Sequence, residues 1–471
     1  MASSVSASNQ NRPELLRELN LWHAIAIVAG TIIGSGIFRV QGEMMREVGS
    51  AGLVYLVWVV GGLLSFGGAL TYAELGAIKP WAGGEYVYVR DAYGSLLGFL
   101  YAWTWFLIAK PASIATVSTG IVDVLGTLPW FSFLNNHVFT LHFTSTNTFE
   151  ITYGTFVAIA ATILISGLNY IGVRKAGSFQ LVLTTLKVGM IVAIMFIGFT
   201  ASQGSWGNFH TTFLGTRGGM AGFMSALVAA LWAYDGWNDL NMVSGEIKDP
   251  GRTIPIALIG GVALVAFLYM GMNAAVQYVL PAATIAGAKV PASLATQAAI
   301  GSLGAALVSA GMAFSMFVTM NGTIMSGGRV PFAVARDGYF FKALAEVHPR
   351  FHTPGLALMV QAVLAIVLLL VGGAFKDLFS LAIFAEWLFY MIAASTIFVF
   401  RKREPDTPRP YRTWGYPVVP GLFIAAAAVL LRYTFMENLR NSIAGTLVIL
   451  AGVPVYLYFA GKKRAAIRPQ N

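Results

Sequence analysis

Lys187 is the residue of this chain that is hardest to explain by a purely structural role. It lies deep inside the apolar run 177–200, where a charged side chain costs at least ~2.5 kcal/mol if the run crosses a membrane. Such a lysine should face the protein interior, and Thr319 and Thr323, which share a helix face at i,i+4, can supply polar partners. Two roles stay open: a fixed cation in place of a coupling sodium ion, or a proton carrier.

Two acidic residues and one aromatic residue inside other apolar runs are further candidates. Asp235 can attract the side chain of a cationic substrate, or it can cap and orient a local break in its helix. Trp232 is either a lid over a bound substrate or an interfacial aromatic, and its depth favours the lid. Glu386 has the same two possible roles as Asp235, a contact to a cationic substrate or a local structural role. Lys110, whose neighbouring proline should kink its helix, and Asp123 are equally consistent with a structural role.

The stretch that must position these groups is GTIIGSGIF at residues 30–38. Each of its glycines costs roughly 1 kcal/mol of helix stability relative to alanine and lets the backbone unwind. In a bilayer, unwound backbone is tolerated only where it is buried in protein or lines a cavity. If the helix breaks near Gly34, its outer half begins with free N–H groups from about Ser35 to Ile37, which form an anion site.

A second break is predicted at LWAYDGWN, residues 231–238, where polar residues and glycine interrupt an apolar run. Carbonyls near Ile32, together with those of Trp232 and Ala233, would attract an ammonium group. One anion site beside one cation site, both built from backbone, matches an amino-acid zwitterion. The alternative is that the small residues of the first stretch only let two helices pack closely.

The composition defines the broad class of protein. The chain has 471 residues, of which 57% are hydrophobic and 11% charged, as expected of a polytopic membrane protein. It has no cysteine, which excludes a disulfide, a thiolate metal site and a cysteine nucleophile. Residues 1–20 lack the pattern of a secretory signal peptide. The net charge of +10 is explained by membrane topology and not by nucleic-acid binding, because the basic residues flank apolar runs.

Runs of about 20 apolar residues predict transmembrane helices. The twelve candidates are 21–40, 51–75, 95–127, 151–172, 177–200, 220–243, 254–280, 303–328, 355–373, 378–400, 418–436 and 443–461. Most Lys and Arg residues fall in connections on one side of the membrane, so the positive-inside rule places both termini in the cytoplasm.

The predicted domain organisation follows from these runs. Residues 1–20 form a cytoplasmic N-terminal segment, 21–461 a single transporter domain, and 462–471 a basic cytoplasmic tail. The interrupted first and sixth runs lie five helices apart, as two inverted five-helix repeats would place them. The repeats would be 21–200 and 220–400, and the last two helices, within 418–461, would be an addition.

Several motifs together resemble the L-type amino acid transporter family of the amino acid/polyamine/organocation (APC) superfamily. They are GTIIGSGIF at 30–38, GGEYVY at 83–88, WAYDGWN at 232–238 followed by Glu246 and Pro250, and His348-Pro349 with Thr353-Pro354. The resemblance spans roughly residues 15–465. It implies an all-α, LeuT-like fold of twelve helices with a 5+5 inverted repeat and discontinuous helices 1 and 6. It also implies sodium-independent transport, usually exchange, of L-amino acids.

The resemblance also assigns site residues. Those it implies for substrate binding are Ile32, Gly34, Ser35, Gly36, Trp232, Ala233, Asp235 and Asn238. The carboxylate would lie at the start of the outer half-helix and the amino group on the carbonyls of the two breaks, with the indole as outer lid. Asn238 would line the site or steady the break. Lys187 would stand near the second sodium site of sodium-coupled relatives, and Thr323 would offer a hydroxyl near its amine.

These observations predict a secondary transporter in the cell membrane that exchanges neutral L-amino acids by alternating access. Proton-coupled uptake and cationic substrates are the alternatives, the latter because of Asp235 and Glu386. We expect no cofactor and no metal, an L-amino acid substrate and membrane lipids as partners, and neither nucleic acid nor a disulfide-linked heavy subunit. Animal family members join a heavy subunit through a cysteine. This chain has none and resembles the microbial members, which work alone. An intramembrane enzyme is disfavoured because the chain lacks the usual protease and serine-hydrolase motifs.

Overall fold

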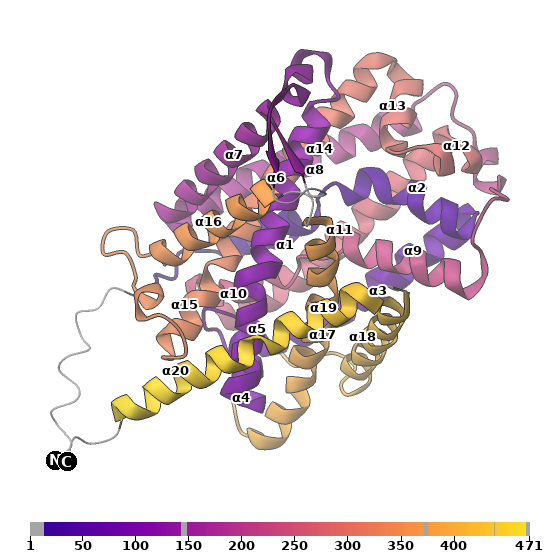
Figure 1. The fold of residues 1–471 in the computed structure, drawn as a ribbon. Coiled ribbons are helices and arrows are strands. Elements are labelled where there is room, and N and C mark those ends of the chain that lie inside the picture. Colours follow the sequence, from indigo (N-terminus) through magenta and orange to yellow (C-terminus); the bar gives the residue numbers. More distant parts are fainter. Residues whose placement is uncertain (1–13, 143–147, 372–374, 438, 468–471) are drawn as a thin grey trace.

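The computed structural model describes residues 14–142, 148–371, 375–437 and 439–467, and these are predominantly helical (Figure 1). Parts of two predicted segments, 1–13 of the N-terminal segment and 468–471 of the basic tail, lie outside the described residues.

The elements of the first half are α1 (Leu21–Ile32), α2 (Gly36–Val48), α3 (Ala51–Ile78), α4 (Glu85–Tyr93), α5 (Ser95–Thr104), η1 (Trp105–Ala109), α6 (Lys110–Leu125), η2 (Pro129–Asn135), β1 (His137–His142), β2 (Thr148–Thr152), α7 (Tyr153–Tyr170) and α8 (Val173–Phe199). Those of the second half are η3 (Trp206–His210), α9 (Gly219–Ala233), α10 (Asp239–Met242), η4 (Ser244–Glu246), α11 (Pro250–Val279), α12 (Ala282–Gly287), α13 (Pro291–Ile300), α14 (Ser302–Gly327), α15 (Arg329–Arg336), η5 (Lys342–Ala345), α16 (Gly355–Val371), α17 (Phe375–Arg403), α18 (Val418–Glu437), α19 (Leu439–Leu450) and α20 (Gly452–Ile467).

The predicted apolar runs coincide with helices. Nine helical segments among the described residues are long and apolar enough to cross a membrane, and they overlap nine of the twelve runs. The other three runs overlap α9, α16 and α17, of which α9 and α16 are apolar but shorter. The helical membrane class is therefore confirmed, whereas the count of twelve spans stays a prediction.

The first break lies where the glycines predict it. Asn20 starts α1 with a capping box, in which its side chain accepts a hydrogen bond from the His23 amide at 3.1 Å. The helix ends at Ile32, because Ile33 has extended backbone (φ −73°, ψ 92°), and a new helix begins at Gly36. The run predicted as one helix over 21–40 is thus two helices, α1 and α2.

The second break separates α9 from the single turn α10. Gly236 has a φ of +104°, which glycine tolerates and residues with a Cβ rarely adopt. A Cβ there would lie 3.2 Å from the carbonyl carbon and oxygen of Thr31, so the two breaks are in direct contact. The Thr31 hydroxyl also donates to the Gly236 carbonyl at 2.9 Å. Segments more than two hundred residues apart in sequence therefore fix each other's unwound backbone.

The predicted kink near Lys110 takes the form of a π-helical turn. The Lys110 amide bonds to the Trp105 carbonyl, five residues back, across η1. Pro111 has no amide hydrogen and its ring clashes with the carbonyl four residues before it, so the turn that precedes it widens.

Short elements in the connections were not predicted from the sequence. The connection 128–150 contains η2 and the antiparallel hairpin β1–β2, the region near 281–300 contains α12 and α13, and α4 follows α3. In Figure 1, α12 and α13 lie at one end of the bundle and α4 at the other. The last helix, α20, continues to Ile467 and so includes Lys462, Lys463 and Arg464 of the predicted basic tail.

A buried ion pair joins the segment that follows the second break to the start of α15. Arg329 donates from Nε and one terminal nitrogen to the two carboxylate oxygens of Glu246, at 2.7 and 2.9 Å, and both side chains are fully buried. The bidentate geometry compensates two charges that would be costly if either were left alone. The pair links η4 to α15, just beyond α10.

Candidate functional site

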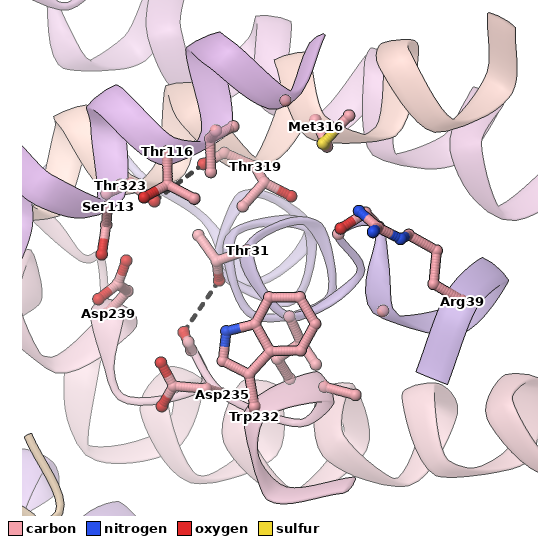
Figure 2. A pocket seen from close by; sticks show the side chains of 18 of the residues that line it. Thr31, Arg39, Ser113, Thr116, Trp232, Asp235, Asp239, Met316, Thr319 and Thr323 are labelled. Carbon is pink, nitrogen blue, oxygen red and sulfur yellow. Dashed lines mark hydrogen bonds between the residues drawn. The ribbon is translucent and has the colours of Figure 1, made fainter. Parts of the chain in front are cut away.

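A cavity of about 250 Å³ lies between the two breaks, and α6, α14 and α17 complete its walls. The sequence-predicted residues that line it are Ile32, Gly34, Ser35, Gly36, Trp232, Ala233, Asp235 and Thr323. The structure thus brings all but two of the predicted site residues to one cavity (Figure 2). The other two are not among the lining residues: Lys187 contacts Thr319, which lines the cavity, and Asn238 contacts Glu85.

The N-terminus of α2 forms part of the cavity wall. Ser35 is the N-cap residue but makes no side-chain hydrogen bond to the helix, so the cap leaves the first N–H groups to the cavity. Ser35 and Gly36 both line the cavity. The N-terminal end of a helix with available N–H groups attracts a carboxylate without needing an arginine.

The carbonyls predicted to hold an ammonium group converge on one tyrosine. Tyr269 on α11 is fully buried, and its hydroxyl lies 2.7 Å from the Ala233 carbonyl and 3.2 Å from the Ile32 carbonyl. A hydroxyl has one hydrogen and a carbonyl oxygen accepts two bonds, so both carbonyls keep capacity for another donor. Tyr269 was not predicted from the sequence, where its only signal is a hydroxyl in an otherwise apolar run.

Lys187 is fully buried and is held by the end of α1. Its ammonium donates to the carbonyls of Ile33 at 2.6 Å and Gly30 at 2.9 Å, and to the Thr319 hydroxyl at 3.4 Å. An ammonium group has three donors and no acceptor, so these three acceptors satisfy its charged form. The predicted partner Thr319 is confirmed.

Two more hydroxyl residues of α14, Ser315 and Thr323, differ in whether they contact the broken end of α1. Ser315, which was not predicted from the sequence, donates to the carbonyls of Ile33 at 2.9 Å and Gly34 at 3.1 Å. Thr323 lines the cavity, but its hydroxyl bonds to the Thr319 carbonyl of its own helix and not to the lysine. The prediction that Thr319 and Thr323 share a helix face is confirmed, since both line the cavity. Within the described residues, Thr323 makes no direct contact with the amine of Lys187.

Asn238 is not among the residues that line the cavity, and its side chain bonds to two other helices. Its amide donates to Glu85 at 2.6 Å, and its carbonyl oxygen accepts from the Tyr390 hydroxyl at 3.3 Å. Tyr390 also donates to Asp235 at 3.0 Å, so one tyrosine of α17 contacts two residues of the break. The sequence offered both roles for Asn238, and the geometry supports the second.

The two ends of the cavity differ in exposure. Arg39 and Asp123 line it where it is open, and both side chains are exposed. At the other end, Asp239 forms a buried ion pair with Lys110 and accepts a hydrogen bond from Ser326 at 2.9 Å. Figure 2 shows Arg39 and Asp239 on opposite sides of the cavity.

Trp232 stands between these two ends. It lines the cavity and is 38% exposed, and Figure 2 shows its indole between Asp235 and Arg39. An aromatic ring in this place can cover a ligand bound against the two breaks, as a lid would.

The comparisons with known proteins agree with this architecture. The family model described as "Amino acid permease" matches residues 19–459. The serine/threonine exchanger SteT of Bacillus subtilis (strain 168) is 32% identical over 96% of this chain and 98% of its own length. The b(0,+)-type amino acid transporter 1 of Mus musculus is 28% identical, over 97% and 90%. The large neutral amino acids transporter small subunit 2 of Oryctolagus cuniculus is 29% identical, over 94% and 80%.

The chain therefore belongs to the amino acid permease family, as the sequence motifs indicated. It is a multi-pass protein of the cell membrane and a transporter, not an enzyme.

Proposed function

We propose that the protein is a sodium-independent exchanger of L-amino acids that works by alternating access. The observation that carries this proposal is the cavity between the two helix breaks, with the N-terminus of α2 on one side and the carbonyls of Ile32 and Ala233 on the other. A zwitterion satisfies both sets of backbone groups at once. The names of the relatives, which include a serine/threonine exchanger, support exchange as the mode of transport.

In this proposal the roles of the site residues follow the geometry. Ser35 and Gly36, with Gly34 before them, receive the carboxylate, and the carbonyls of Ile32, Trp232, Ala233 and Asp235 receive the amino group. Trp232 closes over the substrate from the open end. The hydroxyl of Thr323, on α14, borders the same cavity.

Lys187 acts in this proposal as a fixed cation. Its ammonium already occupies the space among the carbonyls of Gly30 and Ile33 and the Thr319 hydroxyl, where a sodium ion would need the same oxygen ligands. Two of these three acceptors are carbonyl oxygens, which can only accept, so they hold the charged form of the amine. This favours the fixed cation over the proton carrier, and it accounts for transport without sodium.

The structure corresponds in this proposal to an outward-open state. The open end with Arg39 and Asp123 faces the outside, and the Lys110–Asp239 pair with Ser326 seals the cytoplasmic side. This orientation requires both termini to lie in the cytoplasm and the domain 21–461 to cross the membrane twelve times. Residues 21–200 and 220–400 would form two inverted repeats, and the helices within 418–461 would lie outside the repeats. Exchange requires the inner seal to open only when a substrate is bound.

Neutral amino acids are the proposed substrates, with cationic ones as the second candidate. Backbone contacts recognise that a ligand is an amino acid and are indifferent to its side chain. Asp235 favours the cationic candidate because it lines the cavity beside the predicted ammonium site.

Exchange should appear as strong trans-stimulation. Purified protein in vesicles preloaded with unlabelled amino acids should take up labelled L-amino acids much faster than protein in empty vesicles, in sodium-free buffer at equal pH on both sides. The physical reason is that the inner seal opens for the loaded carrier. Protein-free vesicles are the control. Uptake into empty vesicles driven by a proton gradient alone would contradict the proposal and support proton-coupled uptake.

A further inference from the structure

A second large cavity, of about 650 Å³, lies outside the central one, where α5 and η1 meet η5, α16 and α20. In Figure 1, α20 runs alongside α5. This cavity, the lateral groove, falls within the range of ~300–1,000 Å³ that is typical of ligand sites. It shares no lining residue with the central cavity, so the proposed exchange mechanism gives it no role.

The lining of the lateral groove is apolar. Its one polar side-chain group, the indole N–H of Trp103, donates to the Val448 carbonyl at 3.1 Å. Leu356, Val360 and Leu364 are half-buried and recur at every fourth residue of α16, so they form one stripe that is ~12 Å long. A polar ligand would find no side-chain hydrogen bond in the groove, whereas a hydrocarbon chain would cover the stripe.

The walls of the lateral groove belong to apolar helices. The segments Ser95–Leu125 and Ser442–Ala465, which contain α5 and α20, are long and apolar enough to cross a membrane, and α16 is apolar but shorter. Because α16 begins directly after the connection 329–354, which the positive-inside rule places in the cytoplasm, Leu356 marks the cytoplasmic end of the groove. Phe341, which is 61% exposed, lines the same groove from this connection.

Basic side chains gather at the cytoplasmic end of the groove. Lys342 lies between two lining residues, is exposed, and has neither a hydrogen bond nor an ion pair within the described residues. The ring of Phe341 lies 5.1 Å from the ring of Phe459 on α20. The next turn of α20 after this phenylalanine carries Lys462, Lys463 and Arg464.

The nearby acidic residues do not cancel this charge. Asp337 forms an ion pair with Arg90, and Lys463 donates to the backbone carbonyl of Asp337 at 2.7 Å and not to its carboxylate. Glu346 lies in the same connection and forms no ion pair with Lys342 within the described part of the chain. The basic cluster therefore has donors available for an anion.

We infer that the lateral groove binds an anionic phospholipid of the cytoplasmic leaflet. One acyl chain lies along the stripe of α16, and the phosphate lies at Lys342 and Arg464, whose long side chains reach the level of the headgroups. The bound lipid ties η5 to α16 and α20. The inference is carried by the combination of an apolar cavity and a basic rim, which ordinary boundary lipid does not need. It rests on the proposed cytoplasmic side of the connection 329–354 and not on amino-acid exchange.

The test uses a phosphatidylglycerol probe with a photoreactive diazirine in one acyl chain, added to the purified full-length protein in detergent. Cross-links mapped by mass spectrometry should concentrate in peptides that contain Phe341, Val360 or Val455. Unlabelled phosphatidylglycerol should displace the probe at a roughly tenfold lower concentration than phosphatidylcholine, because two basic side chains favour the anionic headgroup. Inorganic phosphate should not displace the probe, since it cannot occupy the apolar stripe.

Two pairs of variants separate the acyl chain from the headgroup. Val360→Trp fills the groove and should largely abolish labelling of these peptides. Val363→Trp is its matched control, because Val363 lies on the same helix but is 59% exposed and is not among the lining residues. Lys342→Gln combined with Arg464→Gln should remove the preference for phosphatidylglycerol. Lys175→Gln, which changes an exposed lysine of α8, should retain it.

Several results would overturn the lipid site. Labelling spread evenly over the apolar helices, or equal labelling of Val360→Trp and Val363→Trp, would show boundary lipid only. Equal displacement by the two phospholipids in wild type, displacement by inorganic phosphate, or displacement by a sterol but by neither phospholipid would reject an anionic phospholipid as the occupant. Binding is measured without transport, so these outcomes leave the proposed exchange untouched. A protein that binds the probe as expected but exchanges no amino acid would fail only in its proposed function.

Discussion

Lys187→Ala should abolish amino-acid exchange or reduce it roughly a hundredfold or more, while the protein still folds and inserts. The substitution removes the ammonium that ties the carbonyls of Gly30 and Ile33 to the Thr319 hydroxyl. The hydroxyls of Ser315 and Thr319 still donate to these carbonyls, but the charge-assisted hydrogen bonds of the ammonium, worth about 1.5–3 kcal/mol each, are lost, so the end of α1 is held less firmly. That end carries one wall of the cavity. Exchange in vesicles measures the effect, and thermal stability in detergent checks the fold.

Lys175→Ala is the matched control for this experiment. Lys175 lies on the same helix, α8, but its side chain is exposed, so exchange should continue at nearly the wild-type rate. Full retained exchange in Lys187→Ala would overturn the role of the lysine. Proton uptake that accompanies amino-acid entry in wild type and disappears in Lys187→Ala would identify it as a proton carrier and not as a fixed cation.

Gly36→Val should reduce substrate binding on the order of a hundredfold. A Cβ at Gly36 would lie 3.0 Å from the Cβ and 3.3 Å from the Cα of Ala233, so the first residue of α2 packs directly against the end of α9. The two methyl groups of valine force these half-helices apart and displace the N–H groups proposed to bind the carboxylate. Loss of two charge-assisted hydrogen bonds of about 1.5–3 kcal/mol each accounts for the magnitude.

Two control substitutions test whether the loss is specific to Gly36 or follows from replacing any glycine in these helices. A Cβ at Gly34 would meet only the Thr319 hydroxyl, at 3.9 Å, so Gly34→Ala should bind substrate far better than Gly36→Val. A Cβ at Gly189 on α8 would have no atom of the described residues within 4 Å, so Gly189→Val should be close to wild type. Equilibrium binding of labelled amino acid measures all three. Wild-type affinity in Gly36→Val would show that the contact between the half-helices does not shape the site.

The breaks were the part of the site that the sequence predicted best. Glycine and polar residues inside an apolar run have a direct physical meaning in a membrane, so residues 30–38 and 231–238 could be recognised without any tertiary information. The structure places both breaks at one cavity and brings Thr31 into contact with Gly236. Family membership, inferred from the same motifs, is confirmed by the comparisons.

The partners of the breaks could not be predicted in the same way. Tyr269, Ser315 and Glu85 each bond to a break residue that is distant in sequence. No pattern marks Tyr269 or Ser315, and the motif GGEYVY that contains Glu85 did not indicate that this residue contacts a break. Their roles depend on how the helices pack, which hydropathy does not specify. The short elements α4, α12 and α13 were missed for a related reason, since they lie in connections that have no long apolar run.

The central claim is that backbone groups of the two breaks recognise the carboxylate and the amino group of a substrate. The most direct test is competition against a labelled amino acid that the protein exchanges, using that amino acid, its carboxamide and its α-hydroxy acid. We expect that the unlabelled amino acid competes fully and that loss of either the carboxylate charge or the amino group nearly abolishes competition, whatever the side chain. Equal competition by the carboxamide or by the hydroxy acid would contradict the claim.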